Sequence, residues 1–367
     1  MKYHTFISTL FFLQVLSGCT NPQQPINFAA HPIYVFSGQH AVPGNEHAQV
    51  TALDRKTFAP IGTRTLELSY INEALFDGSR LWYGYAGDID VDMNTVAQLS
   101  TDLSNESVYK VCTEPNGVHN DGDSLIVLCT QNGMIAHATR IRKGDGAVEA
   151  EADIVTKWGD MMYIDSVLFN GELIVYGGGH YADFSDRTAQ ELQVRDPKTL
   201  QLIRVIETPK TELGMKNFIV MNKDLYILNM ASKYAAVYGF LPVDVLRYHS
   251  GSAKLESLPL IARSPHDGII IGEYLYTLHN TYDNYDGQTV SIYKTNLKTW
   301  KMTHWDYDGE HYMHLNDMQE IDGKIILALF QSHQPAREGI YELNTTTGAL
   351  DFRTFVPGAS LIIDTNS

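Results

Sequence analysis

The stretch Phe169-Asn170-Gly171-Glu172-Leu173-Ile174-Val175-Tyr176 places an Asn-Gly pair between two apolar runs. Asn and Gly both adopt the positive φ angles that a two-residue turn between antiparallel strands requires, so this stretch predicts a tight β-hairpin. Ile321-Asp322-Gly323-Lys324-Ile325-Ile326-Leu327 has the same pattern. Related versions occur at residues 77–83, 121–127, 222–227 and 271–276.

The hairpins recur at regular intervals along the chain. The first apolar residues after the turns are separated by 44, 48, 52, 50 and 50 residues, and they are Leu81, Leu125, Leu173, Leu225, Leu275 and Ile325. One more copy begins at residue 33, which is 48 residues before Leu81. A second hairpin follows the first, most plainly at 192–200 and again at 50–58, 292–300 and 341–348. Four strands in each repeat are typical of β-propeller blades, whose neighbouring sheets bury each other's faces.

The repeats predict an all-β protein with a seven-bladed β-propeller. The first copy has no room for its innermost strand, because only a short polar linker separates residue 33 from Cys19. The apolar run Ala359-Ser360-Leu361-Ile362-Ile363-Asp364 is a spare strand at the other end of the chain. We expect this run to provide the missing inner strand and close the ring, so that no sheet edge stays open.

The N-terminal residues predict an export signal. Lys2 provides a positive charge, and residues 6–16 form an apolar stretch that is too short to span a bilayer. The stretch ends in Leu16-Ser17-Gly18-Cys19, which resembles the lipobox of bacterial lipoproteins, with cleavage before Cys19 and lipidation of that residue. The alternative is an ordinary signal peptide with an incidental cysteine. We expect a signal peptide at 1–18, a linker at 19–30 and the propeller at 31–367.

The lipobox resemblance also indicates a location. Thr20, rather than an aspartate, follows Cys19, and by resemblance this favours the outer membrane or the surface of a Gram-negative cell. The acyl chains would anchor the protein to that membrane. In an exported protein Cys112 and Cys129 can form a disulfide bond, and two buried free thiols are the equally open alternative.

The net charge excludes one class of partner. The chain has 27 basic and 43 acidic residues, a formal charge of −16, so it lacks the basic field that would neutralise nucleic acid phosphates. A sulfated polymer would need a locally basic groove on this acidic body. We expect a monomer without an organic cofactor.

Titratable side chains gather at four places in the repeats. His119 and His137 lie on blade three, and the loop from Gly177 carries His180 and Tyr181 on blade four. Blade five has a long aromatic loop at 231–242, and blade six has His266 and His279 opposite each other on adjacent strands. A single strand histidine is usually a satisfied polar group. The collection on blades three and four is what makes an active site the stronger interpretation.

A propeller with His, His, Tyr and Arg in this blade order resembles the seven-bladed ulvan lyases, especially polysaccharide lyase family 25. The resemblance implies that His119 is the catalytic histidine, that His137 is a second, substrate-binding histidine, and that Tyr181 is the catalytic tyrosine. The arginine that binds the substrate carboxylate would be Arg195 by spacing or Arg187 by topology, because Arg187 begins the same strand on the loop side.

The resemblance implies two further features. Tyr238, with Tyr234 as the fallback, would contact the substrate. A structural zinc would bind His266 and His279, although the two could also form a hydrogen-bonded pair. His180 and Asp183 are possible further ligands.

The implied reaction is chemically consistent with these residue types. A lyase that acts on a uronic acid removes the C5 proton and expels the oxygen at C4. An arginine that neutralises the carboxylate makes the C5 proton more acidic, and histidine and tyrosine can transfer the protons. The alternatives are a non-enzymatic propeller lipoprotein, acting as an envelope scaffold or ligand-binding module, and a lyase of the oligogalacturonate type, which would show a more compact set of metal ligands.

Overall fold

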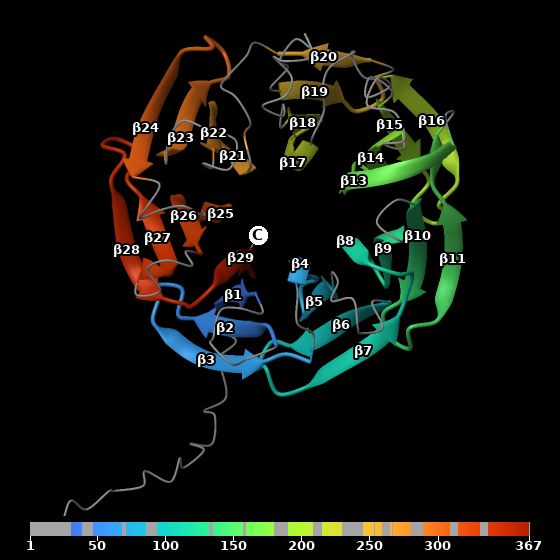
Figure 1. The fold of residues 1–367 in the computed structure, drawn as a ribbon, viewed down its shortest axis with the longest axis horizontal. Helices are drawn as coiled ribbons and strands as arrows, with labels where there is room; N and C mark the ends of the chain where they lie inside the picture. Colours follow the sequence, from blue (N-terminus) through green and yellow to red (C-terminus); the bar gives the residue numbers. More distant parts are fainter. Residues whose placement is uncertain are drawn as a thin grey trace, which may run out of the picture.

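Seven sheets stand around a central axis in the structure, which is a computed structural model (Figure 1). The seven-bladed β-propeller predicted from the repeats is confirmed. The structure describes residues 31–38, 47–67, 71–85, 94–131, 135–156, 159–179, 190–207, 215–229, 245–252, 254–258, 265, 267–279, 289–308, 315–330 and 337–366. Among these residues, no helix has the length and apolar character needed to cross a membrane.

The blades follow one another in chain order, and the first-named strand of each blade lies nearest the axis. Blade one consists of β29 (Ala359–Asp364), β1 (Ile33–Ser37), β2 (Gln49–Leu53) and β3 (Pro60–Thr65). Blade two consists of β4 (Ile71–Phe76), β5 (Arg80–Tyr85), β6 (Thr95–Ser100) and β7 (Glu106–Lys110). Blade three consists of β8 (Pro115–Asp121), β9 (Ser124–Gln131), β10 (Ile135–Arg142) and β11 (Val148–Asp153). Blade four consists of β13 (Gly159–Phe169), β14 (Glu172–Gly179), β15 (Gln190–Arg195) and β16 (Leu202–Glu207), with the short β12 (Val155–Thr156) paired to β13.

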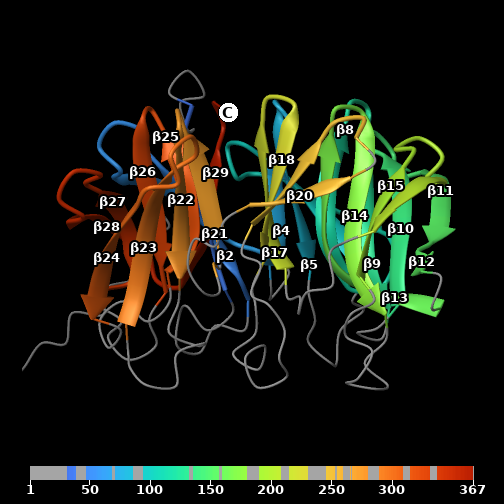
Figure 2. The same ribbon diagram turned by 90° about the horizontal axis from the view of Figure 1, so that it is seen from above.

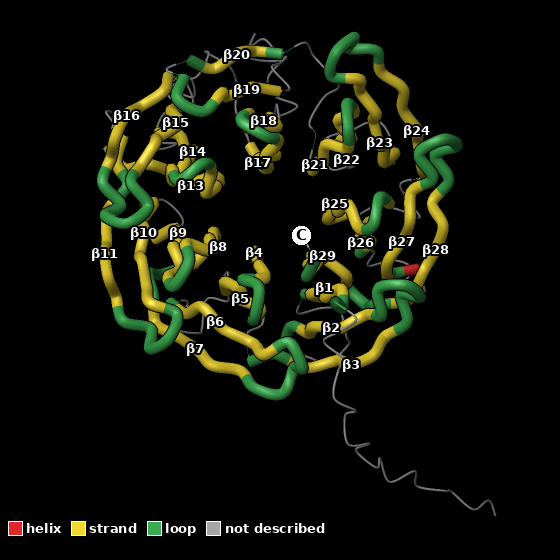
Figure 3. Tube along the Cα trace, turned by 180° about the vertical axis from the view of Figure 1, so that it is seen from behind, coloured by secondary structure: helices red, strands yellow, loops and turns green. Residues whose placement is uncertain are grey.

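The other three blades repeat this order, as the view from behind also shows (Figure 3). Blade five consists of β17 (Met215–Met221), β18 (Asp224–Asn229), β19 (Val245–His249) and β20 (Leu255–Ser257). Blade six consists of β21 (Asp267–Ile271), β22 (Tyr274–His279), β23 (Thr289–Asn296) and β24 (Met302–Asp308). Blade seven consists of β25 (Leu315–Ile321), β26 (Lys324–Leu329), β27 (Gly339–Leu343) and β28 (Leu350–Phe355).

The core lies between the blades. Within the described ranges, buried apolar side chains form seven clusters, and each cluster joins two neighbouring blades. In β5, Leu81 and Tyr83 pack toward blade one, whereas Trp82 packs toward blade three. Successive side chains of a strand point to opposite faces, so both faces of a blade are buried. This burial on both faces explains the continuous apolar runs in the sequence.

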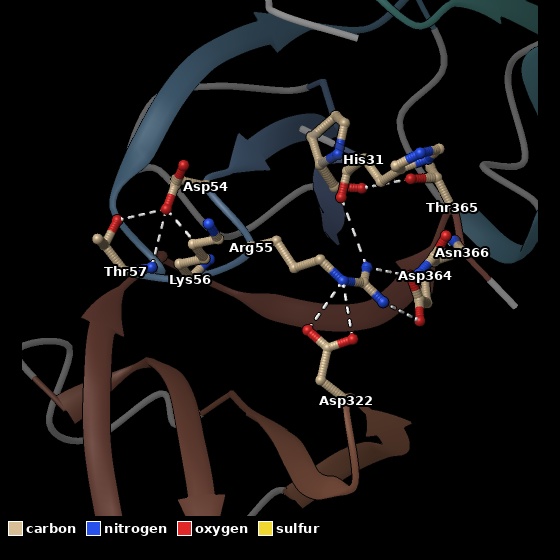
Figure 4. Close-up of polar contacts among 10 residues, drawn as sticks. His31, Asp54, Arg55, Lys56, Thr57, Asp322, Asp364, Thr365 and Asn366 are labelled. Carbon is tan, nitrogen blue, oxygen red and sulfur yellow. Dashed lines mark hydrogen bonds and ion pairs between the residues drawn. The ribbon is translucent and has the colours of Figure 1, made fainter. Parts of the chain in front are cut away.

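The C-terminal strand closes the ring as predicted. β29 pairs antiparallel with β1, from Ile33 opposite Asp364 to Ser37 opposite Ala359. Arg55, in the turn after β2, strengthens the closure (Figure 4). Its guanidinium donates to both carboxylate oxygens of Asp364, at 2.5 and 2.8 Å, and its Nε donates to Asp322 of blade seven at 3.0 Å. The two ends of the chain are therefore joined by a strand ladder and by an ion-pair network.

Carboxyl groups, buried at Asp267 and Asp317 and half-buried at Glu73, connect the innermost strands of neighbouring blades, a feature that the sequence did not predict. Each accepts a backbone N–H group from the next blade, as in Val118 to Glu73, Met318 to Asp267 and Ile362 to Asp317, at 3.1, 2.7 and 2.5 Å. Burial is the largest influence on these groups, and it raises the pKa of all three carboxyls above the usual range.

The ring has two different faces (Figure 2). The turn face carries the tight turns from the first strand of a blade to the second and from the third to the fourth. Asn170 and Gly171 form such a turn with φ angles of 50° and 76°, as the hairpin prediction requires. The connection face is the opposite one, where second strands end and third strands begin, so Gly179 and Gln190 lie there.

Cys112 and Cys129 form a disulfide bond, which decides between the two alternatives for these cysteines. Cys112 precedes β8 and Cys129 lies on β9, and both belong to the apolar cluster between blades two and three. Disulfide bonds are typical of proteins that leave the reducing cytoplasm.

Candidate functional site

His119 lies on the innermost strand of blade three and points toward blade four. Its Nε2 is 2.6 Å from Oγ of Ser166 on β13, and both residues are buried. Burial lowers the pKa of His119 to about 4, so the imidazole is neutral at pH 7. A neutral imidazole can exchange a proton with a hydroxyl group, but His119 is only 9% exposed, which leaves little room for a polysaccharide.

His137 has a more accessible setting on β10, close to the connection face. Its Nδ1 is 2.8 Å from Oδ1 of Asp153, the last residue of β11. The side chain of His137 is 14% exposed and that of Asp153 is 73% exposed. The carboxylate orients the ring and fixes which nitrogen carries a proton, which is the arrangement that a histidine needs to act as a general base.

The structure does not bring His119 and His137 together. His119 is paired with Ile126, and His137 is paired with Cys129. Directly paired residues point to the same face of a sheet, and Ile126 packs toward blade four whereas Cys129 packs toward blade two. The strand spacing and the three-residue offset along β9 separate the two backbone positions by roughly 14 Å.

The side chain of Arg195 is hydrogen-bonded within its own strand and the turn that follows it. It is the last residue of β15, at the turn face, and it is 4% exposed. Nε and Nη2 donate to Oε1 of Gln193 at 2.9 and 2.7 Å, and Nη1 donates to the carbonyl oxygen of Leu200 at 2.8 Å. This geometry argues against Arg195 as the arginine that binds a substrate carboxylate, so Arg187 is the remaining candidate of the two.

Several predicted residues lie outside the described part of the chain, namely Cys19, Tyr181, Arg187, Tyr234 and Tyr238. The strand ends that border them are described. The three glycines at 177–179 continue β14 in extended form, opposite Tyr163, Met162 and Met161, rather than forming a turn. The chain therefore leaves β14 toward Tyr181 at the connection face.

The zinc hypothesis has one ligand that the structure describes. His266 lies outside the described residues, as do the two suggested further ligands. His279 is buried, its Nε2 is 2.9 Å from Oγ1 of Thr277, and its ring packs edge-on against Tyr293 at a centroid distance of 4.6 Å. Within the described ranges, no three His, Cys, Asp or Glu side chains are grouped to hold a metal ion. The zinc site stays a prediction.

Sequence reasoning missed the partners of both histidines. Ser166 is 47 residues from His119, and Asp153 is 16 residues from His137. Neither partner belongs to a recognisable motif, because its proximity depends on strand register and on how two blades meet. One local signal points to Asp153: it ends the fourth strand of blade three, at the same face of the ring where the third strand, which carries His137, begins.

Comparison with known proteins shows the fold and no family. No family model matches the chain, and no curated protein has a matching sequence. A protein from Bacteroides fragilis NCTC 9343, provisionally named 6-phosphogluconolactonase, is similar over 92% of this chain and 98% of its own, with a TM-score of 0.62 and 12% identity. A protein of the same provisional name from Bacteroides uniformis ATCC 8492 is similar over 90% of this chain and 99% of its own, with a TM-score of 0.59 and 12% identity. The dihydro-heme d1 dehydrogenase NirN is similar over 93% of this chain and 67% of its own, with a TM-score of 0.58 and 13% identity.

Proposed function

We propose that the chain is an exported polysaccharide lyase that cleaves ulvan between sulfated rhamnose and uronic acid by β-elimination. The observation that carries the proposal is the His137–Asp153 pair near the connection face, with 2.8 Å between Nδ1 and Oδ1. The choice of ulvan rests on the order of histidine, tyrosine and arginine along blades three and four, which resembles that of the ulvan lyases.

The pair suits removal of the C5 proton. When Nδ1 donates to the carboxylate of Asp153, Nε2 is the nitrogen that can accept a proton from the substrate. Partial exposure of His137 leaves it within reach of a polymer, whereas His119 is enclosed between two blades. We therefore assign proton abstraction to His137 and a structural role at the contact between blades three and four to His119, which departs from the roles implied by the family resemblance.

Two further groups are needed, one to neutralise the uronate and one to protonate the leaving oxygen. We assign the first role to Arg187 and the second to Tyr181, with Tyr238 as a further substrate contact. Tyr181 and Arg187 belong to the segment between Gly179 and Gln190, whose two ends lie on the same face of the ring as His137. A bidentate arginine lowers the energy of the carbanion-like transition state by neutralising the carboxylate.

The position of the first strand supports the proposed attachment to the envelope through Cys19. β1 begins at Ile33, opposite Leu53 and Asp364, which places the start of the propeller at the turn face. A lipid anchor that precedes this point would be joined to the face opposite His137. The connection face would then be turned away from the membrane and open to a large polymer.

The proposal is tested by following ultraviolet absorbance of the unsaturated uronic product with ulvan, pectate and heparin. We expect a signal with ulvan, and its absence would refute the lyase. His137→Gln and Asp153→Asn should each lower kcat by about 100-fold or more, because a positioned general base contributes about that much. His119→Gln, the matched change on the same blade, should lower thermal stability and retain activity. Full activity of His137→Gln would remove His137 from the mechanism.

The separation of His119 from His137 favours a second candidate, a non-enzymatic propeller that binds a ligand or supports envelope assembly. Two histidines on opposite faces of one sheet do not form a shared catalytic site. Saturable binding of ulvan without any absorbance change would support this candidate and refute the lyase.

A further inference from the structure

A groove opens on the turn face between blades six and seven. It has a volume of about 520 Å³, and it is formed by β22, β23 and β24 of blade six and the turn between β27 and β28. The lining residues that matter for binding are Tyr274, Lys294, Lys301, Thr303, Trp305 and Thr346. This face is opposite the one that carries His137, so the groove is separate from the proposed catalytic site.

The groove is basic on a strongly acidic protein. Among the residues that the structure describes, two lysines and no acidic residue line it, although the whole chain carries a formal charge of −16. Within the described part of the chain, neither Lys294 nor Lys301 takes part in an ion pair. The neighbouring carboxylate of Glu273 is paired with Lys298 at 2.8 Å, which leaves the charges of the groove uncompensated.

The ammonium group of Lys294 is held by neutral partners. It lies 4.5 Å from the ring centroid of Tyr274 and 5.6 Å from that of Tyr276, and 3.4 Å from the carbonyl oxygen of Thr345. Cation–π contacts and a carbonyl oxygen fix its position without cancelling its charge. A fixed cation loses less entropy when it binds an anion than a free surface lysine does.

Trp305 forms a rigid wall of the same groove. Its indole packs against Gly348, where a Cβ atom would lie only 2.1 Å from Cδ1 of the tryptophan. The hydroxyl of Tyr307 donates to the carbonyl oxygen of Gly348 at 2.7 Å and holds the turn in place. The backbone and the aromatic wall are therefore arranged before any ligand binds.

We propose that this groove binds an anionic saccharide unit. A sulfate ester or uronate carboxylate would interact with Lys294 and Lys301, the apolar face of the sugar ring would pack on Trp305, and the exposed hydroxyls of Thr303 and Thr346 would contact the sugar hydroxyls. The site would hold a polyanionic chain away from the catalytic face. The proposal goes beyond the lyase assignment, since it requires binding and no cleavage.

The test measures the Kd of the purified full chain by isothermal titration with ulvan, with ulvan from which sulfate has been removed, and with neutral dextran. The double variant Lys294→Gln with Lys301→Gln should weaken ulvan binding by about ten-fold or more, because each lysine contributes a charge-assisted contact. Lys298→Gln, in the turn between β23 and β24 and paired with Glu273, is the matched control, and its Kd should stay within about two-fold of the parent value. Added salt should weaken binding to the parent chain.

Unchanged ulvan affinity of the double variant, or equally tight binding of dextran, would overturn the proposal. Thermal melting of each variant shows whether the fold is retained, and retention is the expected result because neither lysine is buried. Groove-dependent binding without an absorbance signal would refute the lyase and leave this site standing. Absorbance with no effect of the lysine changes would refute this site alone.

Discussion

The environment of His119 predicts a specific dependence of stability on pH. Burial holds its folded-state pKa at about 4, whereas the unfolded chain has the ordinary value of about 6.5. Between these two values the unfolded state binds a proton that the folded state does not. The contribution of His119 to stability is therefore fully present above pH 6.5 and is lost as the pH falls toward 4.

The size of the effect follows from the two pKa values. Lowering the pH from 7.5 to 5.0 should remove about 2 kcal/mol, and the full loss below pH 4 should be about 3.4 kcal/mol. With the usual unfolding entropy per residue and about 340 residues in the ring, 2 kcal/mol corresponds to a change in Tm of about 3 °C.

The assay compares parent and His119→Gln by thermal melting at pH 7.5 and at pH 5.0. Glutamine can still bond to Ser166 but does not titrate, so the parent should lose about 3 °C of its Tm advantage over the variant at the lower pH. Comparing the Tm difference between parent and variant at the two pH values cancels the effects of other titrating groups, including the carboxyls between the blades. A matched His249→Gln change, at a histidine side chain that is 61% exposed, controls for removal of a histidine. A Tm difference that is the same at both pH values would refute the reasoning.

The remaining predictions concern ring closure and the disulfide bond. Arg55→Met should lower the free energy of unfolding by about 3 kcal/mol in urea titrations, because it removes the only charge of opposite sign that the described residues place against the Asp364 carboxylate, whose side chain is 8% exposed. Arg142→Met, at an arginine whose side chain is 53% exposed, should cost less than about 1 kcal/mol, and equal losses would contradict the closure role. Replacing Cys112 and Cys129 by serine should lower the free energy of unfolding by about 3 kcal/mol, because the disulfide bond joins residues that are 17 positions apart. A stability of the parent chain that does not change under reducing conditions would contradict this prediction.

The fold could be predicted because its signals are local. A turn such as Asn170-Gly171 needs positive φ angles, and few residue types adopt them, so each turn marks a hairpin without knowledge of the rest of the chain. Counting strands then exposed the missing one in blade one and the spare run at 359–364. The closure required no more than the physical cost of an unpaired sheet edge.

The carboxyl groups between the blades show where this local reasoning ends. Glu73, Asp267 and Asp317 occupy similar places in their repeats, but their partners are backbone groups 45, 51 and 45 residues away. An acidic residue on a strand normally indicates an exposed face, and only the meeting of two inner strands shows why it is buried. The arginine of the closure is similar, since Arg55 reaches Asp364 across 309 residues.

The candidate site depended on a quantity that residue order does not contain, which is the face of the sheet to which a side chain points. In a strand that face alternates with every residue, so a shift of one position reverses it. β8 contains an irregularity between Pro115 and Gly117, and the positions beyond it set His119 opposite Ile126 and therefore toward blade four. His137 is paired with Cys129, so its side chain lies on the same face of the sheet and points toward blade two. A blade order that resembles that of a known enzyme is therefore compatible with two different sites, and the carboxylate beside His137 is what favours that histidine.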